Sequence, residues 1–120
     1  MNLKQFDIVM VDLNPTKGSE QSWICPCVIM QSNAVSDYWK TTIIAVLTSK
    51  KIDKIYPFEV LVKSLKESWL NIDSKLKLDQ IKVIDKSRII NRIWKISNKE
   101  IIEQIFSSLD NILDRQWYFR

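Results

Sequence analysis

The chain has no histidine among its 120 residues. Imidazole is the commonest general base and the commonest zinc ligand in proteins, so any catalysis here must use other side chains. Cysteine is scarce as well, with only Cys25 and Cys27, which are spaced as C-P-C. Two thiols cannot complete a four-ligand zinc site, and we expect neither a metal nor another cofactor. We expect both cysteines to be reduced residues in or beside a strand, and a redox pair is the alternative.

Long apolar runs are also missing. The longest such stretch, residues 43–47, is far shorter than the roughly 20 residues that cross a bilayer. The N-terminus has no apolar segment before its first charged residues, as a secretory signal would require. We therefore expect a cytoplasmic protein with no membrane association. The length of 120 residues and the hydrophobic content of 46% suit one domain over residues 1–120, with a core that needs no disulfide or metal.

The charge and one polar segment indicate an anionic partner. The formal net charge of +4 favours a polyanion such as nucleic acid, although the base composition of the genome explains an excess of lysine equally well. Residues 14–22 are polar and contain Pro15 and Gly18, which predicts an exposed loop. Its hydroxyls, amide and cation could hold a phosphate, and a solvated turn is the alternative.

Most of the chain has the pattern of short strands. Residues 41–48 form a nearly continuous apolar run, which suits a central strand covered on both faces. Residues 75–85 alternate with a change of phase near Gln80, which predicts a bulge. A polar turn is expected over residues 32–40. Strands are predicted over residues 6–13, 27–31, 41–48, 58–62, 75–85 and 89–96.

The last element is an amphipathic helix. The sequence S-N-K-E matches a capping box, with Ser97 as the N-cap and Glu100 as its partner. Seven apolar residues then follow at helical spacing and predict a stripe that packs on a sheet. These are Ile101, Ile102, Ile105, Phe106, Leu109, Ile112 and Leu113. The fold class expected is therefore mainly β with a C-terminal helix, in a small, strongly curved antiparallel barrel.

Five sequence blocks resemble the MazF/PemK family of toxin endoribonucleases. In order, they are V-D-L-N-P-T-K-G-S-E-Q at 11–21, I-C-P-C-V-I at 24–29, L-T-S-K at 47–50, Y-P-F-E-V at 56–60 and L-D-Q-I-K-V-I-D-K-S-R at 78–88. The resemblance implies an SH3-like barrel that acts as a homodimer. It also implies sequence-specific cleavage of single-stranded RNA without metal, with the substrate's 2′-hydroxyl as nucleophile, and inhibition by a cognate antitoxin of a type II toxin–antitoxin system.

The resemblance also assigns roles to individual residues. Glu20 corresponds to the acidic residue that accepts the 2′-hydroxyl proton, and Thr48 to the threonine that donates a hydrogen bond to the scissile phosphate. The family's key arginine stands before the proline of an R-P pair, and Cys25 occupies that position here. We expect RNA contacts from polar residues of the first and last blocks, namely Thr16, Lys17, Ser19, Gln21, Gln80, Lys86 and Arg88.

Cys25 is the main departure from the family pattern. A thiol has neither the fixed charge nor the reach of a guanidinium, and loss of one such donor costs roughly a hundred- to a thousandfold in rate. An active chain would need a replacement cation, such as Lys17, Lys50 or Arg88. The alternatives are a catalytically inactive relative that only binds RNA or antitoxin, and a gyrase poison of the CcdB type, against which the P-T-K-G-S-E-Q and L-T-S blocks argue.

Glycine occurs once and tryptophan five times, which is the reverse of ordinary usage. Four tryptophans fall where relatives are expected to carry glycine: Trp23, Trp39, Trp69 and Trp94. Trp117 lies beyond the matched blocks. Our hypothesis is that the source reads UGA as glycine and that the printed sequence decodes it as tryptophan. The alternative is that the tryptophans are genuine and serve a dimer interface or RNA stacking.

Overall fold

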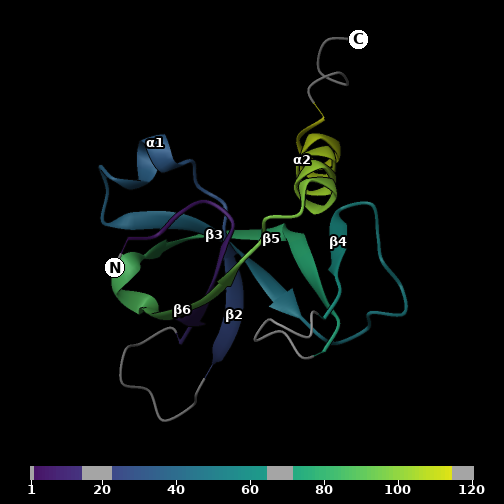
Figure 1. Cartoon of the computed structure of the whole chain (residues 1–120), viewed down its shortest axis with the longest axis horizontal. Helices are drawn as coiled ribbons and strands as arrows, with labels where there is room; N and C mark the ends of the chain where they lie inside the picture. Colours follow the sequence, from purple (N-terminus) through teal and green to yellow (C-terminus); the bar gives the residue numbers. More distant parts are fainter. Residues whose placement is uncertain (1, 15–22, 65–71, 115–120) are drawn as a thin grey trace.

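The computed structural model describes residues 2–14, 23–64 and 72–114. Within these ranges, six strands, two α-helices and one 3₁₀ turn follow one another (Figure 1). They are β1 (Asp7–Asp12), β2 (Ile24–Ile29), α1 (Asn33–Ser36), β3 (Thr41–Thr48), β4 (Glu59–Val62), β5 (Ser74–Asp85), η1 (Lys86–Arg88), β6 (Ile89–Lys95) and α2 (Lys99–Leu113). The prediction of a mainly β chain that ends in a helix is confirmed.

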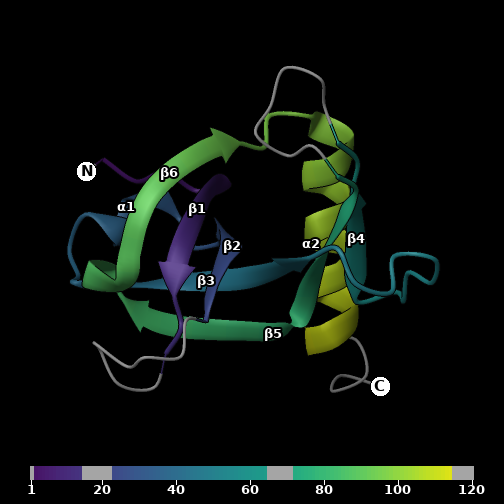
Figure 2. The same cartoon turned by 90° about the horizontal axis from the view of Figure 1, so that it is seen from below.

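All the strand pairs belong to one antiparallel sheet with the order β4-β5-β3-β2-β1-β6. The sheet is strongly curved, and Figure 2 shows β6 and β5 on opposite sides of the rolled strands. The long apolar run forms β3, which lies between β2 and β5 as a central strand should. The change of phase near Gln80 is a bulge, because the partner of Ala45 is Ile81 and the partner of Val46 is Lys77.

Each face of the sheet has its own apolar core. On one face α2 packs against β4 and β5 through the fully buried Ile105, and Phe106 makes an edge-to-face contact with Phe6. The other face buries Val9, Cys27 and Ile44. The central strands are therefore covered on both sides, which explains their continuous apolar sequence.

Three details of the predicted elements were wrong. β2 begins at Ile24 instead of residue 27. Pro26 lies within this strand opposite Met10 of β1 and does not interrupt the pairing of the two strands. The polar turn contains the short helix α1, which Ser32 caps. The N-cap of α2 is Asn98, not Ser97. The Asn98 side-chain oxygen accepts hydrogen bonds from the backbone N–H groups of Glu100 (2.9 Å) and Ile101 (3.2 Å).

None of the helices within the described ranges combines the length and the apolar composition that crossing a bilayer requires.

Candidate active site

The strand register brings Cys25 and Thr48 together. β2 and β3 pair Cys27 with Val46, and two residues further along both strands the same register places Cys25 level with Thr48. Residues two apart in a strand point to the same face, so both side chains share the face of Cys27 and Val46. On the other side of Thr48, its partner in β5 is Lys75. Thr48 is half-buried, and its hydroxyl oxygen accepts a hydrogen bond from the Lys50 N–H at 3.2 Å.

The two cysteines are free thiols on this face, as expected, with their sulfur atoms 3.9 Å apart. The hydrogen bond with Cys27 lowers the pKa of Cys25 to about 7, helped by the positive charge of Lys82 and opposed by burial. The same hydrogen bond, together with burial and the charge of Cys25, raises the pKa of Cys27. Cys25 is therefore partly a thiolate at neutral pH, and Cys27 remains a thiol.

A group of charges centred on the buried Glu59 lies beside Thr48, and sequence reasoning missed it. Lys75 Nζ lies 3.0 Å from one Glu59 carboxylate oxygen, and Lys77 Nζ lies 3.6 Å from the other. Burial alone would raise the pKa of Glu59. The backbone N–H of Tyr56, the hydrogen bond from Lys75 and the charges of both lysines instead hold that pKa below its ordinary value. The alternating lysines in 75–78 were a signal that both share one face, but nothing in the sequence pairs them with Glu59.

An aromatic pair borders this charged group. The rings of Tyr56 and Phe58 stack with 5.2 Å between centroids. The ammonium groups of Lys54 and Lys75 lie 4.9 and 5.9 Å from the centre of the Tyr56 ring. The Lys75 ammonium also donates to the Lys54 carbonyl at 3.3 Å, which ties the segment before β4 to β5.

The ends of the predicted polar loop are clamped together next to Cys25. Leu13 N–H donates to the Trp23 carbonyl at 2.9 Å, and Trp23 N–H donates to the Asn14 side-chain oxygen at 3.1 Å. Asn14 is held in turn by Asp12, which accepts from both its backbone and its side-chain nitrogen. The intervening residues, including the predicted site residues Thr16, Lys17, Ser19, Glu20 and Gln21, lie outside the described residues.

The remaining predicted RNA contacts are at Gln80, Lys86 and Arg88. Gln80 is exposed in the bulge of β5. The Lys86 ammonium donates to the Ser36 carbonyl, at the opposite end of β3 from Thr48. Arg88 Nη1 donates to the carbonyl of Asp12 at 3.2 Å and to that of Asn14, so it supports the base of the polar loop. Their contact with RNA stays a prediction.

The tryptophan hypothesis also stays a prediction. Trp23, Trp39 and Trp94 are exposed by 58%, 64% and 42%, and none of the three has the positive φ that would demand glycine. Trp69 and Trp117 lie outside the described residues. UGA at the tryptophan codons of the gene would support reassignment, and UGG at any of the four matched positions would weaken it.

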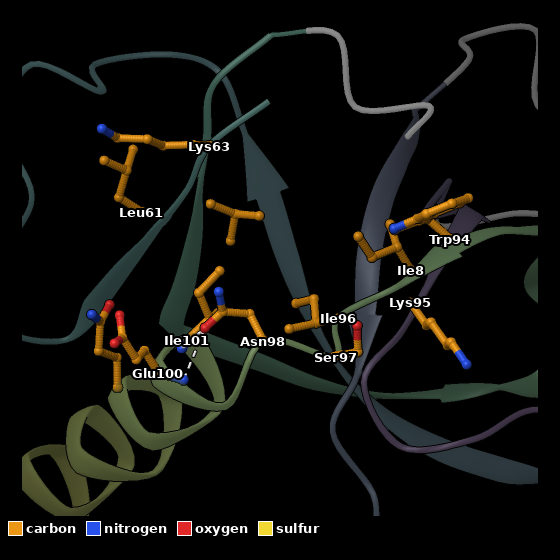
Figure 3. Close-up of a pocket in the computed structure, with 12 residues that line it drawn as sticks. Ile8, Leu61, Lys63, Trp94, Lys95, Ile96, Ser97, Asn98, Glu100 and Ile101 are labelled. Atoms are coloured by element: carbon orange, nitrogen blue, oxygen red, sulfur yellow. Dashed lines mark hydrogen bonds between the residues drawn. The ribbon is translucent and has the colours of Figure 1, made fainter. Parts of the chain in front are cut away.

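A pocket of about 440 Å³ lies elsewhere, between the ends of β4 and β6 and the start of α2 (Figure 3). Leu61, Trp94 and Ile101 contribute its apolar walls, and Lys63 and Lys95 lie at its margin. Neither Cys25 nor Thr48 lines it. The described residues also contain no group of three or more acidic, cysteine or histidine side chains that could hold a metal ion.

Comparison with known proteins gives a consistent result. A family described as "PemK-like, MazF-like toxin of type II toxin-antitoxin system" matches residues 4–113. The endoribonuclease MazF of Staphylococcus epidermidis is 32% identical over 112 residues, which cover 93% of this chain and 88% of that protein. The endoribonuclease MazF of Staphylococcus saprophyticus is 33% identical over 101 residues, covering 84% and 83%. A MazE–MazF crystal structure from Deinococcus radiodurans has a TM-score of 0.75 at 18% identity, covers 96% of this chain and 98% of its own, and shares the fold.

Proposed function

Because this chain belongs to the PemK-like, MazF-like toxin family, we propose that it is an endoribonuclease toxin that cleaves single-stranded RNA at specific sequences. The observation that carries the proposal is the match over residues 4–113, supported by relatives named endoribonucleases at 32% and 33% identity. The matched relatives favour this function over an inactive relative and over a CcdB-type gyrase poison.

The proposed reaction needs no imidazole. Glu20 accepts the proton of the 2′-hydroxyl, and the 2′-oxygen attacks the adjacent phosphorus. The bond to the 5′-oxygen then breaks, and that oxygen takes a proton from solvent water, so the products carry a 2′,3′-cyclic phosphate and a 5′-hydroxyl. Thr48 supports this reaction because its hydroxyl lies half-buried at the end of β3, where it can donate to a phosphate oxygen.

We propose two protein partners, a second copy of this chain and an antitoxin. The D. radiodurans neighbour was solved as a MazE–MazF assembly. A net charge of +4 suits an acidic antitoxin segment as well as RNA. We also propose that the protein acts in the cytoplasm, where mRNA would be its substrate.

Cut-site mapping tests the proposal. Purified protein is incubated with a mixed RNA pool in EDTA, and the ends produced are sequenced and analysed for cyclic phosphate. We expect cuts at one short sequence, and their loss in Thr48→Ala. The function would be contradicted if this protein left the RNA pool intact while a catalytically active relative cut the same pool in a parallel reaction. DNA gyrase inhibition without RNA cleavage would support the CcdB-type alternative.

A further inference from the structure

Cys25 and Cys27 form a close thiol pair, which the proposed RNA cleavage does not require. Both are free thiols, and their sulfur atoms lie 3.9 Å apart. The Cys27 thiol also donates to the Cys25 carbonyl oxygen at 3.7 Å. One residue separates the two cysteines in β2, so their side chains leave the strand on the same face. Two sulfur atoms already in contact need only a short movement to form a bond of about 2.05 Å.

The two thiols differ in their access to solvent. Cys25 is half-buried, whereas Cys27 has an exposed fraction of 0%. The lowered pKa of Cys25 keeps part of it as thiolate at neutral pH, and the thiolate is the form that oxidants attack. A dissolved oxidant therefore reaches Cys25 first, and Cys27 is placed to react second.

The residue between the two cysteines suits a short bridge. A fully extended strand sets the Cα atoms of residues two apart at about 6.8 Å, which is the upper end of the range that a disulfide tolerates. The ring of Pro26 confines φ to about −65°, which is less extended than the roughly −140° of an ideal antiparallel strand. The chain between Cys25 and Cys27 is therefore already shortened towards the spacing of a disulfide.

We propose that Cys25 and Cys27 are a modification site at which a hydroperoxide produces a reversible disulfide, and that this bond disturbs the adjacent candidate active site. Formation of the bond does not depend on RNA cleavage. Its effect on cleavage rests on the proposed function and adds a means of regulating that same site.

The reaction consumes one hydroperoxide for each disulfide. The Cys25 thiolate attacks one peroxide oxygen, the O–O bond breaks, and the leaving oxygen takes a proton to become water or an alcohol. Cys25 is then a sulfenic acid, oxidised by the two electrons that the peroxide has accepted. The Cys27 sulfur next attacks the Cys25 sulfur while its proton passes to the departing hydroxyl. The S–S bond forms, the S–O bond breaks and water leaves.

Oxidation of Cys25 also makes the second step easier. The negative charge of Cys25 is one of the causes that raise the pKa of Cys27. A sulfenic acid is neutral, so this effect disappears once Cys25 has been oxidised. The buried Cys27 thiol can then lose its proton more readily as it attacks.

The strand pairing indicates which part of the fold moves when the bond forms. The pairing of β2 with β3 covers Cys27–Ile29, and β1 also pairs with Cys27 on its other side. Cys25 lies nearer the strand end and pairs with Val11 of β1. Shortening of β2 should therefore move the Cys25 end. Next to that end, the Leu13 N–H donates to the Trp23 carbonyl at 2.9 Å and closes the base of the polar loop, so the bond should weaken this clamp.

Counting thiols in the full-length chain tests the disulfide. The reduced protein is treated with hydrogen peroxide at neutral pH and then unfolded in urea with N-ethylmaleimide, and its intact mass is measured. We expect two labels before treatment. After treatment we expect no label and a mass lower by two hydrogen atoms, and dithiothreitol should restore both labels. Non-reducing gel electrophoresis shows whether the bond lies within one chain.

Two matched substitutions separate the roles of the thiols. In Cys27→Ala the oxidised Cys25 has no partner, so peroxide should leave a sulfenic acid that dimedone traps. In Cys25→Ala the buried Cys27 should keep its label. Circular dichroism checks folding, and if either variant fails to fold, the label count and mass of the wild type decide alone.

Hydrogen–deuterium exchange and RNA cleavage measure the effect on the adjacent site. Oxidation should speed exchange of the Leu13 amide. The Met30 amide, which donates to the Ile43 carbonyl at 2.8 Å beyond the other end of β2, is the matched control and should not change. We expect the oxidised protein to cut RNA at least tenfold more slowly than the reduced protein. This is a cautious part of the roughly hundredfold cost of misplacing a reacting group by about 1 Å, and dithiothreitol should restore the rate.

Each outcome decides one part of the inference. Two labels after peroxide, a gain of oxygen instead of the loss of hydrogen, or a bond between two chains overturns the disulfide. A disulfide that leaves the Leu13 exchange or the cleavage rate unchanged overturns its effect on the adjacent site. If the reduced wild type cuts no RNA, the proposed function fails, and the label count and the Leu13 exchange still decide the inference.

Discussion

At the scale of single residues, Cys25 combines two unusual properties. It occupies the position where the family resemblance places an arginine, and its thiol is held near neutrality by Cys27 first and by Lys82 second, against the effect of burial. A thiolate repels phosphate, whereas the neutral thiol does not. The protonation of one atom therefore changes the charge of the proposed site within the physiological range of pH.

The pH dependence of Cys25 follows directly. With a pKa lowered from 9.0 to about 7, the folded protein binds fewer protons than the unfolded chain between these values. Between these values the shift of Cys25 stabilises the fold, and this contribution is lost as pH falls towards 7. Above pH 9 the raised pKa of Cys27 acts in the opposite direction. We expect Cys25 to react with iodoacetamide with a midpoint near pH 7, while Cys27 stays unreactive up to pH 9. Mass spectrometry of the alkylated peptide measures both, and a midpoint near pH 9 for Cys25 would contradict the lowered pKa.

Replacing Cys25 by arginine tests whether a positive charge at this position supports RNA cleavage. Cys25→Arg places a fixed charge level with Thr48, so it should raise RNA cleavage at least tenfold over the parent protein, a cautious part of the value of one donor. Adding Thr48→Ala should abolish the gain. Initial rates on a labelled RNA carrying the mapped cut site provide the measurement. If the tryptophan codons are UGA, the series is repeated with glycine at Trp23, which lies two residues from the substitution. No gain in either background would mean that a cation at position 25 does not reach the phosphate.

At the scale of elements, the sequence predicts more of the fold than of the site. The apolar run of β3, the bulge at Gln80 and the stripe of α2 are local patterns, and the first two were read correctly from the sequence. The stripe was read correctly in part, because Ile105 and its neighbours pack on the sheet whereas Ile112 and Leu113 at its end are exposed. The start of β2 was missed because proline in a short run argues against a strand. The ion pairs of Glu59 with Lys75 and Lys77 depend on the β4–β5 register, which no local pattern reveals.

The corrected start of α2 can be tested by stability. Two good capping residues, Ser97 and Asn98, stand side by side, and the structure uses Asn98 for two N–H groups. We expect Asn98→Ala to lower the free energy of unfolding by about 1 kcal/mol, and Ser97→Ala to change it by clearly less. Urea unfolding followed by circular dichroism measures both. If the two substitutions lowered the free energy of unfolding equally, or Ser97→Ala lowered it more, the result would support Ser97 as the N-cap, as the sequence predicted.

At the scale of the whole molecule, the curved sheet leaves apolar side chains on its outside. Ile81 and Val83 of β5 are exposed by 40% and 68%, and Ile90 and Trp94 of β6 by 51% and 42%. Ile81 and Val83 lie two residues apart in β5 and so point to the same face of that strand, and apolar side chains that are exposed side by side are costly to leave in water. A second copy that presents the same surface around a twofold axis would cover them and would join two basic protomers into one RNA-binding surface.

The dimer prediction can therefore be tested at a single side chain. Light scattering at micromolar concentration should give the mass of two chains for the wild type. Val83→Glu introduces a charge at the most exposed of these apolar positions and should shift the mass towards one chain, since an unpaired carboxylate buried in an interface costs several kcal/mol. Val35→Glu on α1, where the parent side chain is 42% exposed, is the matched control and should leave the dimer intact. Because Val83 is exposed in the protomer, the Val83→Glu chain should keep the wild-type circular dichroism spectrum. A wild-type mass of one chain would refute the dimer, and an unchanged dimer in Val83→Glu would move the interface away from β5.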